Sequence, residues 1–245
     1  MEIVFWIVIL FLLTYEPIFG FYHFQKFKQN MKRSESAKIK YYKDVMVGLW
    51  VPALFILTLA VCTDLSLKQM GITIPAIRTG TLGSFASYIF LGLGILYFVL
   101  VLYCMIGYWC SQKVKHDLSK KKAEEMKKSD IGDILPITLK EKRIWNYVSL
   151  TAGITEELIY RGFLLFALAA LFPSLSIWIV VLAASLIFGL AHTYQGFWQG
   201  VVRTSCFGFL FCSLSIILGS IIPLIVLHFL VDYIGKLGDE NVFKA

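Results

Sequence analysis

Apolar runs long enough to cross a membrane recur seven times along this chain, and they constrain its fold more than any other feature. A helix needs about 20 residues to cross the roughly 30 Å of hydrocarbon in a bilayer. We therefore expect an all-α, polytopic membrane protein with about seven transmembrane helices. The expected spans are 3–24, 45–62, 85–110, 144–171, 175–193, 198–218 and 221–237.

The composition supports this fold class. Hydrophobic residues make up 58% of the 245 residues and the mean hydropathy is +0.73, whereas soluble domains are about 45–50% apolar. We expect three N-terminal spans in 1–110, a lysine-rich cytoplasmic loop in 111–143, a catalytic core of four spans in 144–237, and a C-terminal tail in 238–245. The first run lacks a basic start and precedes a lysine-rich stretch, which favours a retained span over a signal peptide.

The net charge of +7 comes largely from two basic stretches, 25–43 (which includes Lys32) and 111–143. Basic stretches that flank apolar spans favour the positive-inside rule and contact with anionic lipids over nucleic-acid binding. Placing both in the cytoplasm makes 63–84 external. The N-terminus then lies outside and the C-terminus inside.

Six ionisable side chains fall inside three of the last four expected spans. Each costs roughly 2.5–3.5 kcal/mol at bilayer depth on insertion scales. They must therefore pair with one another or line a wet cavity, which we expect inside the last four helices. The six are Glu156, Glu157, Arg161, His192, His228 and Asp232.

The first group lies in the sequence TAGITEELIYRG, which starts at Thr151. Glu157 and Arg161 are four residues apart, so they share a helix face and can form an ion pair. Glu156 is rotated by about 100° from Glu157 and keeps an unbalanced carboxyl group. Such a group suits general acid–base catalysis. The alternative is a purely structural ion pair between helices.

The other two groups also have a spacing of four residues. Phe188 and His192 bound the sequence FGLAH, and His228 and Asp232 bound HFLVD. Taken alone, His192 is typical of an interfacial structural histidine, and His228 with Asp232 of a buried polar pair that joins helices.

Together the six residues have the chemistry of a hydrolytic site. A carboxylate and an imidazole can activate water, and further polar groups can stabilise the oxyanion that forms. The chain lacks GxSxG and HExxH, and its five cysteines form no CxxC. We therefore expect no side-chain nucleophile, no disulfide framework, no metal and no cofactor.

The motifs EExxxR, FxxxH and HxxxD/N, in this order on successive helices, resemble those of the CAAX prenyl protease and bacteriocin-processing family of intramembrane proteins, also called the CPBP or Abi family. The resemblance covers about 136–235 and includes the sequences EELIYRGFL and Gly219-Ser220-Ile221-Ile222-Pro223. The first three spans are similar only in general hydrophobicity.

The resemblance implies a metal-independent glutamate endopeptidase that cuts a membrane-bound or lipidated peptide. It implies that Glu156 with His192 activates water, that His228 with Asp232 holds the oxyanion, and that Glu157 with Arg161 holds the site together. It also implies a multi-pass protein of the bacterial cytoplasmic membrane. Asp232 departs from the asparagine of the prenyl-protease branch, and a carboxylate suits an oxyanion site only when it is protonated.

Three alternatives compete with a protease. One is a non-enzymatic bacteriocin self-immunity or scaffold protein of the same family. A second is a metal-dependent hydrolase with His192, His228 and a glutamate as ligands. The third is a proton-coupled transporter. Glu16 and Arg203 are interpreted as structural residues, and an approach of Glu16 to the cavity is left open.

The depth of His192 poses a problem for the protease hypothesis. Glu156 and His228 fall near the middle of their runs, whereas His192 falls near the cytoplasmic end of its own. Untilted spans would separate His192 from the other groups by about 10 Å or more, given a rise of 1.5 Å per residue. We expect a cavity that is open to the cytoplasm.

Overall fold

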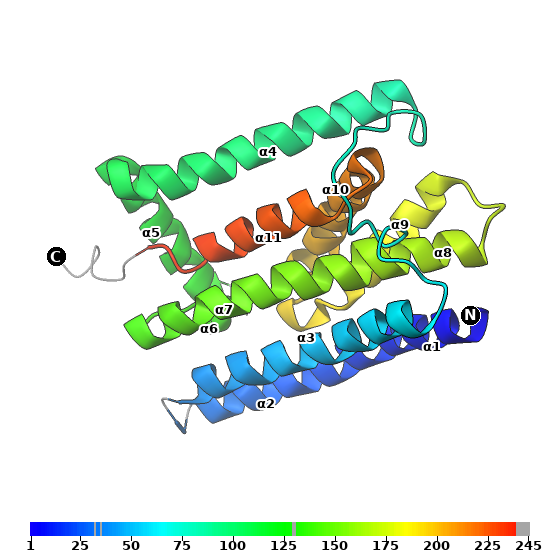
Figure 1. Cartoon of the computed structure of the whole chain (residues 1–245). Helices are drawn as coiled ribbons and strands as arrows, with labels where there is room; N and C mark the ends of the chain where they lie inside the picture. Colours follow the sequence, from blue (N-terminus) through cyan, green and yellow to red (C-terminus); the bar gives the residue numbers. More distant parts are fainter. Residues whose placement is uncertain (32, 35, 129–130, 239–245) are drawn as a thin grey trace.

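The structure, a computed structural model, describes residues 1–31, 33–34, 36–128 and 131–238. Lys32 of the first basic stretch and residues 239–245 of the expected tail lie outside the described residues. Helices joined by turns make up the described part of the chain, and no strand occurs in it (Figure 1). This confirms the all-α fold class.

Seven helical units follow the order of the seven expected spans. Three of them contain a π-helical stretch (η1, η2 or η4) that continues into α-helix. The units are α1–η1–α2 (Glu2–Thr14, Tyr15–Gly20, Phe21–Met31), α3 (Ala37–Cys62), α4 (Ser84–Cys110), α7–η2–α8 (Leu139–Glu156, Glu157–Leu164, Leu165–Leu171), α9 (Ile177–Leu190), η4–α10 (Phe197–Val202, Arg203–Leu218) and α11 (Ile222–Ile234).

By length and composition, four units are apolar and long enough to cross a membrane: Glu2–Met31, Ala37–Cys62, Ser84–Cys110 and Phe197–Leu218. Helices α9 and α11 are apolar but shorter. The α7–η2–α8 unit contains the charged motif. The protein is therefore a polytopic membrane protein, as the sequence predicts.

The lysine-rich segment 111–143 connects α4 to α7, but much of it is helical. It forms α5 (Gln112–Lys128) and the short α6 (Ile131–Ile134). Two buried lysines attach this region to its neighbours: Lys122 donates to the carbonyl oxygen of Pro136 at 2.7 Å, and Lys38 donates to that of Leu135 at 2.9 Å. Some basic residues therefore hold the loop in place instead of facing lipid headgroups.

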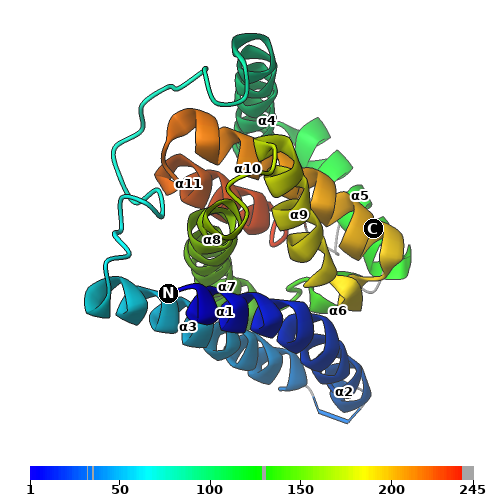
Figure 2. The ribbon, with the colours of Figure 1, turned by 90° about the vertical axis from the view of Figure 1, so that its right-hand side faces the viewer.

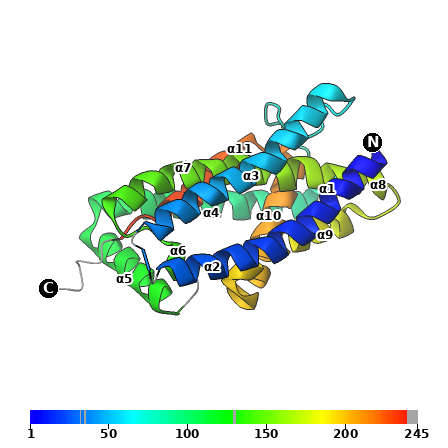
Figure 3. The ribbon, with the colours of Figure 1, turned by 90° about the horizontal axis from the view of Figure 1, so that it is seen from below.

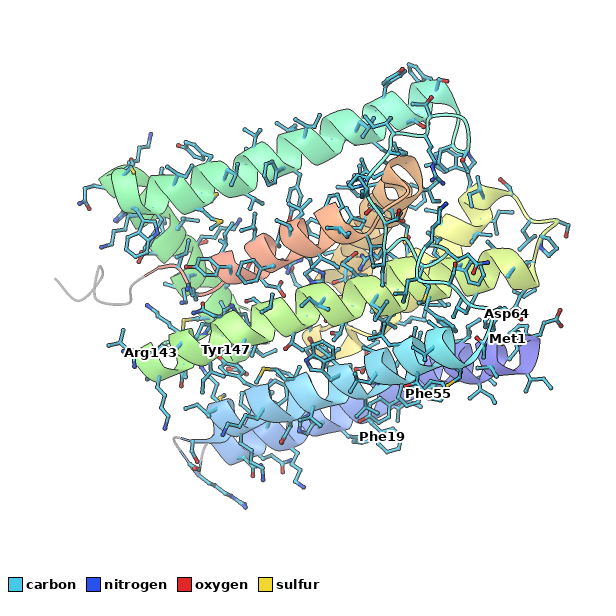
Figure 4. The ribbon with its side chains drawn as sticks, viewed as in Figure 1. Met1, Phe19, Phe55, Asp64, Arg143 and Tyr147 are labelled. Carbon is cyan, nitrogen blue, oxygen red and sulfur yellow. The ribbon has the colours of Figure 1, made fainter. Side chains whose placement is uncertain are left out.

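Both basic stretches lie at the same end of the helix bundle. In Figure 1, the α2–α3 turn and the α5–α6 region occupy the left-hand end. Figure 4 places Met1 and Asp64 at the opposite end from Arg143 and Tyr147, and Figure 3 shows the same arrangement from below. This alternation is the one expected for seven consecutive spans.

Helix α7 lies at the centre of the bundle, between α3 and α11 (Figure 2). Helices α9 and α10 pack against each other, and α4 covers α10 and α11 from outside. The core next to α7 is formed mainly by apolar residues of α1, η2, α8 and α9. The first three spans therefore enclose the later four from two sides.

The turn between α10 and α11 is covered by the segment 63–83. Ala76 and Arg78 donate backbone hydrogen bonds to the carbonyls of Leu218 and Ile217, and Ile221 donates to that of Gly71. Because this segment satisfies the backbone of the turn, α11 can begin within the bundle. Because α11 begins there, His228, six residues later, lies at the depth of the C-terminal end of α7.

Candidate active site

The first of the three motifs, which contains Glu156, Glu157 and Arg161, lies where α7 changes into a π-helix. Glu156 is the last residue of α7 and Glu157 the first of η2. π-helical turns are rare and occur frequently at functional sites. The expected pair is present, since Nη1 of Arg161 lies 2.9 Å from Oε1 of Glu157, and the two side chains are 1% and 0% exposed.

Aromatic rings complete the surroundings of Arg161. Its guanidinium carbon lies 4.0 Å from the ring centre of Phe188 and 5.2 Å from that of Phe211. Cation–π contacts of this kind stabilise a desolvated cation. Arg161 therefore balances the charge of Glu157 and also links η2 to α9 and α10.

His192 lies at the same depth as Glu156, which removes the problem of its position. Fifteen residues separate Glu156 from Leu171 at the end of α8, and fifteen separate Ile177 at the start of α9 from His192. The two arms of this hairpin have the same number of residues and return to a similar level, as the 3.9 Å between Nε2 of His192 and Oε2 of Glu156 shows. Helix α9 is short and ends at Leu190, inside the bundle.

The imidazole of His192 is oriented by the residue four positions before it. Its Nδ1–H donates to the carbonyl oxygen of Phe188 at 2.9 Å. This bond fixes the tautomer, so Nε2 presents its lone pair to the site. Nε2 lies 3.9 Å from Oε2 of Glu156. The phenylalanine of the FGLAH sequence thus positions both Arg161 and His192.

His228 contacts both glutamates, through different nitrogens. Its Nδ1–H donates to Oε1 of Glu157 at 2.7 Å, and its Nε2 lies 3.9 Å from Oε2 of Glu156. Glu156 and Glu157 are rotated by about 100° from each other on the helix. Both nevertheless approach His228, which lies between them. Helical geometry alone did not indicate this bridge.

Asp232 lies on the outer side of His228. Its Oδ2 is 3.6 Å from Nε2 of His228, and its side chain is 32% exposed, more than that of any other member of the cluster. Its main-chain carbonyl accepts a hydrogen bond of 2.7 Å from Trp145. The structure thus brings all six predicted residues into one cluster, with Asp232 at its edge.

A cavity of about 430 Å³ reaches the cluster from the first two helical units. Glu156, Tyr160 and His192 line it on the cluster side, and Lys26 and Asp44 line it on α2 and α3. It extends toward the basic end of the bundle, as expected. His228 and Asp232 do not line it, but Nε2 of His228 lies 3.9 Å from Oε2 of Glu156, which does.

Glu16 is a cavity residue that sequence reasoning treated as structural. It lies in η1 and lines the same cavity as Glu156 and His192. A carboxyl group without a nearby basic residue in an apolar span was the signal that could have identified it. The hydroxyl of Thr193, next to His192, donates to the carbonyl oxygen of Pro17 at 3.2 Å and joins this helix to the site.

Within the described residues, no group of three or more His, Cys, Asp or Glu side chains is placed to hold a metal ion. The imidazoles instead have hydrogen-bond partners that fix their orientation: Phe188 for His192 and Glu157 for His228.

Comparison with known proteins identifies the family of this region. Residues 142–234 match the family described as type II CAAX prenyl endopeptidase, Rce1-like. This part of the chain is similar to the CAAX protease family. All six clustered residues lie within the match, which covers α7 to α11 and less than half of the chain. No curated protein and no solved structure matches the chain.

The match confirms the resemblance to the CAAX protease family found in the sequence. At the level of the family, it supports a CAAX-type membrane endopeptidase. The cavity walls formed by α1 to α3 lie outside the matched residues. The family match therefore covers the cluster but not the cavity walls formed by the first helices.

Gly153 allows the CAAX-protease core to close around the cluster. A Cβ atom at this position would lie 3.0 Å from the carbonyl oxygen of Ile225 and 3.1 Å from the backbone nitrogen of Phe229. Helices α7 and α11 thus meet backbone to backbone, one turn from Glu157 and His228. Only glycine fits here without moving α11.

We expect Gly153→Ala to lower both thermal stability and peptidase activity. Overpacking typically costs about 1–3 kcal/mol, and a shift of α11 would lengthen the His228–Glu157 hydrogen bond. Thermal unfolding in detergent and kcat/KM for peptide cleavage measure the two effects. Gly92→Ala is the matched control, because no atom lies within 4 Å of its added Cβ. Equal behaviour of the two variants would contradict this role of Gly153.

Proposed function

We propose that this protein is an intramembrane endopeptidase that hydrolyses a peptide bond of a membrane-associated or lipidated peptide with a water molecule activated by Glu156 and His192. One observation carries the proposal: Oε2 of Glu156 lies 3.9 Å from Nε2 of both His192 and His228. This arrangement lies beside a cavity of about 430 Å³ that Glu156 and His192 line.

Separations of 3.9 Å are too long for direct hydrogen bonds and fit a bridging water molecule. Nε2 of His192 can only accept in the neutral tautomer, because Nδ1 donates to Phe188. A water molecule between Glu156 and His192 would therefore donate one hydrogen to each. Its oxygen lone pair would remain free to attack.

In the proposed reaction, the water oxygen forms a bond to the scissile carbonyl carbon while Glu156 takes the proton. The tetrahedral intermediate then loses the amine as the C–N bond breaks, and Glu156 returns the proton to the leaving nitrogen. A group that first accepts and then donates a proton is typical of general acid–base catalysis. The products are a carboxylic acid and an amine, which become a carboxylate and an ammonium group by proton exchange, and no covalent enzyme intermediate forms.

The oxyanion would be stabilised by Nε2 of His228. Its Nδ1–H is committed to Glu157, so Nε2 carries a proton only in the imidazolium form of His228, and that proton then points toward Glu156 and the water site. A protonated Asp232 would donate a second hydrogen bond, whereas an ionised Asp232 would compete with the oxyanion for Nε2. The pair formed by Glu157 and Arg161 holds His228 in place and does not itself contact the reacting atoms.

The basic end of the bundle, which contains Lys26 and Lys122, is placed in the cytoplasm under this proposal. The positive-inside rule supports this placement. Water and substrate then approach Glu156 from the cytoplasmic side, and the N-terminus lies outside. A bacterial cytoplasmic membrane fits the bacterial branch of the family that the sequence resembles.

Peptide cleavage by the purified protein tests the proposal. The substrates are two quenched fluorogenic peptides with the same sequence, one with S-farnesyl cysteine followed by three residues and one without the lipid. We expect cleavage of the lipidated peptide at a single bond, identified by mass spectrometry, that persists in EDTA and 1,10-phenanthroline. If neither peptide were cut, the result would contradict peptidase activity. Loss of cleavage in the presence of a chelator would contradict metal independence.

A further inference from the structure

Glu16 faces the catalytic residues from a part of the chain that the family match does not include. It lies on η1, between α1 and α2, and lines the same cavity as Glu156 and His192. The Thr193–Pro17 hydrogen bond joins the residue after Glu16 to the residue after His192. Glu16 is therefore held near His192, across the cavity from Glu156.

The carboxyl group of Glu16 has no hydrogen bond or ion pair with any residue that the structure describes. The other acidic residue on this side, Asp44, lies 3.4 Å from His23. A carboxylate at bilayer depth is costly unless a partner balances it, and such residues mark functional sites by default. A positive charge that enters the cavity would supply such a partner for Glu16.

Aromatic rings line the rest of this space. Tyr41 and Tyr160 are buried at its inner wall, and Phe19 and Tyr22 are exposed on α1–η1–α2. Aromatic faces attract a lysine ammonium or an arginine guanidinium, and more strongly where water is excluded. Three carboxyl groups line the cavity, together with one lysine, Lys26, and two histidines, one of which, His23, contacts Asp44. Both its rings and its charges therefore favour a cation.

We infer that Glu16 is a specificity residue, and that the cavity between η1–α2 and α3 binds a basic side chain of the substrate next to the bond that is cut. This inference rests on the proposed peptidase function and narrows its substrates to peptides with a lysine or arginine near the cleavage site. Glu16 binds the substrate side chain and takes no part in the proton transfers at Glu156.

Matched peptides test the inference. Each set shares the farnesylated cysteine and the scissile bond. Lysine, glutamine or glutamate is placed in turn at each position within three residues of that bond, except at the cysteine itself. For the wild type we expect kcat/KM for the lysine peptide to exceed that for the glutamine peptide about tenfold at one or more positions. Glu16→Gln should abolish this ratio, Glu16→Asp should keep most of it, and Glu16→Lys should shift the preference to glutamate.

Glu2→Gln is the matched control. Glu2 lies on the same helical unit, is exposed and does not line the cavity, so its replacement should leave the lysine preference unchanged. Circular dichroism and thermal unfolding show whether each variant is folded. A preference that survives in folded Glu16→Gln, or that is absent from the wild type, would overturn the inference and leave peptidase activity intact. If the cavity bound only the lipid chain of the peptide, the wild type would show no preference for lysine.

A binding measurement separates this inference from the proposed function. Fluorescent lysine and glutamine peptides are titrated against the Glu156→Gln variant and against Glu156→Gln combined with Glu16→Gln. Tighter binding of the lysine peptide that depends on Glu16, without cleavage by the wild type, would overturn the peptidase but support the cation site. Equal binding of both peptides would overturn the cation site.

Discussion

Replacing Glu156 by glutamine should lower kcat for peptide cleavage by about 10²–10⁴-fold, the usual contribution of a general base. Glutamine keeps the shape of the side chain but cannot accept a proton from water. Oε2 of Glu156 has no hydrogen-bond partner among the described residues, so the change should disturb little of the folded structure. The thermal unfolding temperature should stay close to that of the wild type.

Glu141→Gln is the matched control for Glu156→Gln, because Glu141 is also a buried glutamate of α7. Glu141 accepts hydrogen bonds from the backbone nitrogens of Ile137 and Thr138 in a capping box. It lies fifteen residues from Glu156, about 22 Å along the helix. Its replacement should lower stability by about 1 kcal/mol without a comparable loss of kcat. A Glu156→Gln protein with more than a tenth of wild-type kcat would contradict the mechanism.

Replacing Arg161 by methionine should destabilise the protein by about 3–5 kcal/mol, the largest effect on stability that we expect. Glu157 is fully buried, and the change removes its guanidinium partner. Breaking a buried ion pair from one side leaves an uncompensated charge, which explains the large cost. Thermal or denaturant unfolding in detergent micelles measures it.

The double variant Glu157→Gln/Arg161→Met separates stability from catalysis. With both charges removed, no buried charge is left unpaired, and a large part of the lost stability should return. Activity should not return, because His228 loses the carboxylate that holds its Nδ1–H at 2.7 Å. If the double variant were no more stable than Arg161→Met, the two residues would not act as an ion pair.

Hydropathy predicted the span order well because bilayer thickness relates directly to the length of an apolar run. Residues 144–171 and 221–237 correspond to α7–η2–α8 and α11 within a few residues. Sequence spacing also predicted the pair of Glu157 with Arg161, because a separation of four residues places two side chains on one helix face. The helical content of 111–143 was not predicted, since its lysines were interpreted only as topology signals.

Contacts between distant helices could not be derived from spacing. His192 seemed too far from Glu156 until the structure showed that α9 ends inside the bundle. His228 was assigned to the oxyanion side, yet it also bridges Glu156 and Glu157. Glu16 seemed isolated because its neighbours at the cavity, including Tyr160 and His192, lie more than 140 residues away in the sequence.

The sequence by itself determined that this protein is helical, that it lies in a membrane, and that six costly polar groups must meet within it. These properties follow from local periodicity and from the energy of burying charge in lipid. Only the tertiary structure decided which nitrogen faces which carboxylate and which helix closes the cavity. Those choices depend on the level at which each helix starts and ends, and on the backbone contact that Gly153 allows between α7 and α11.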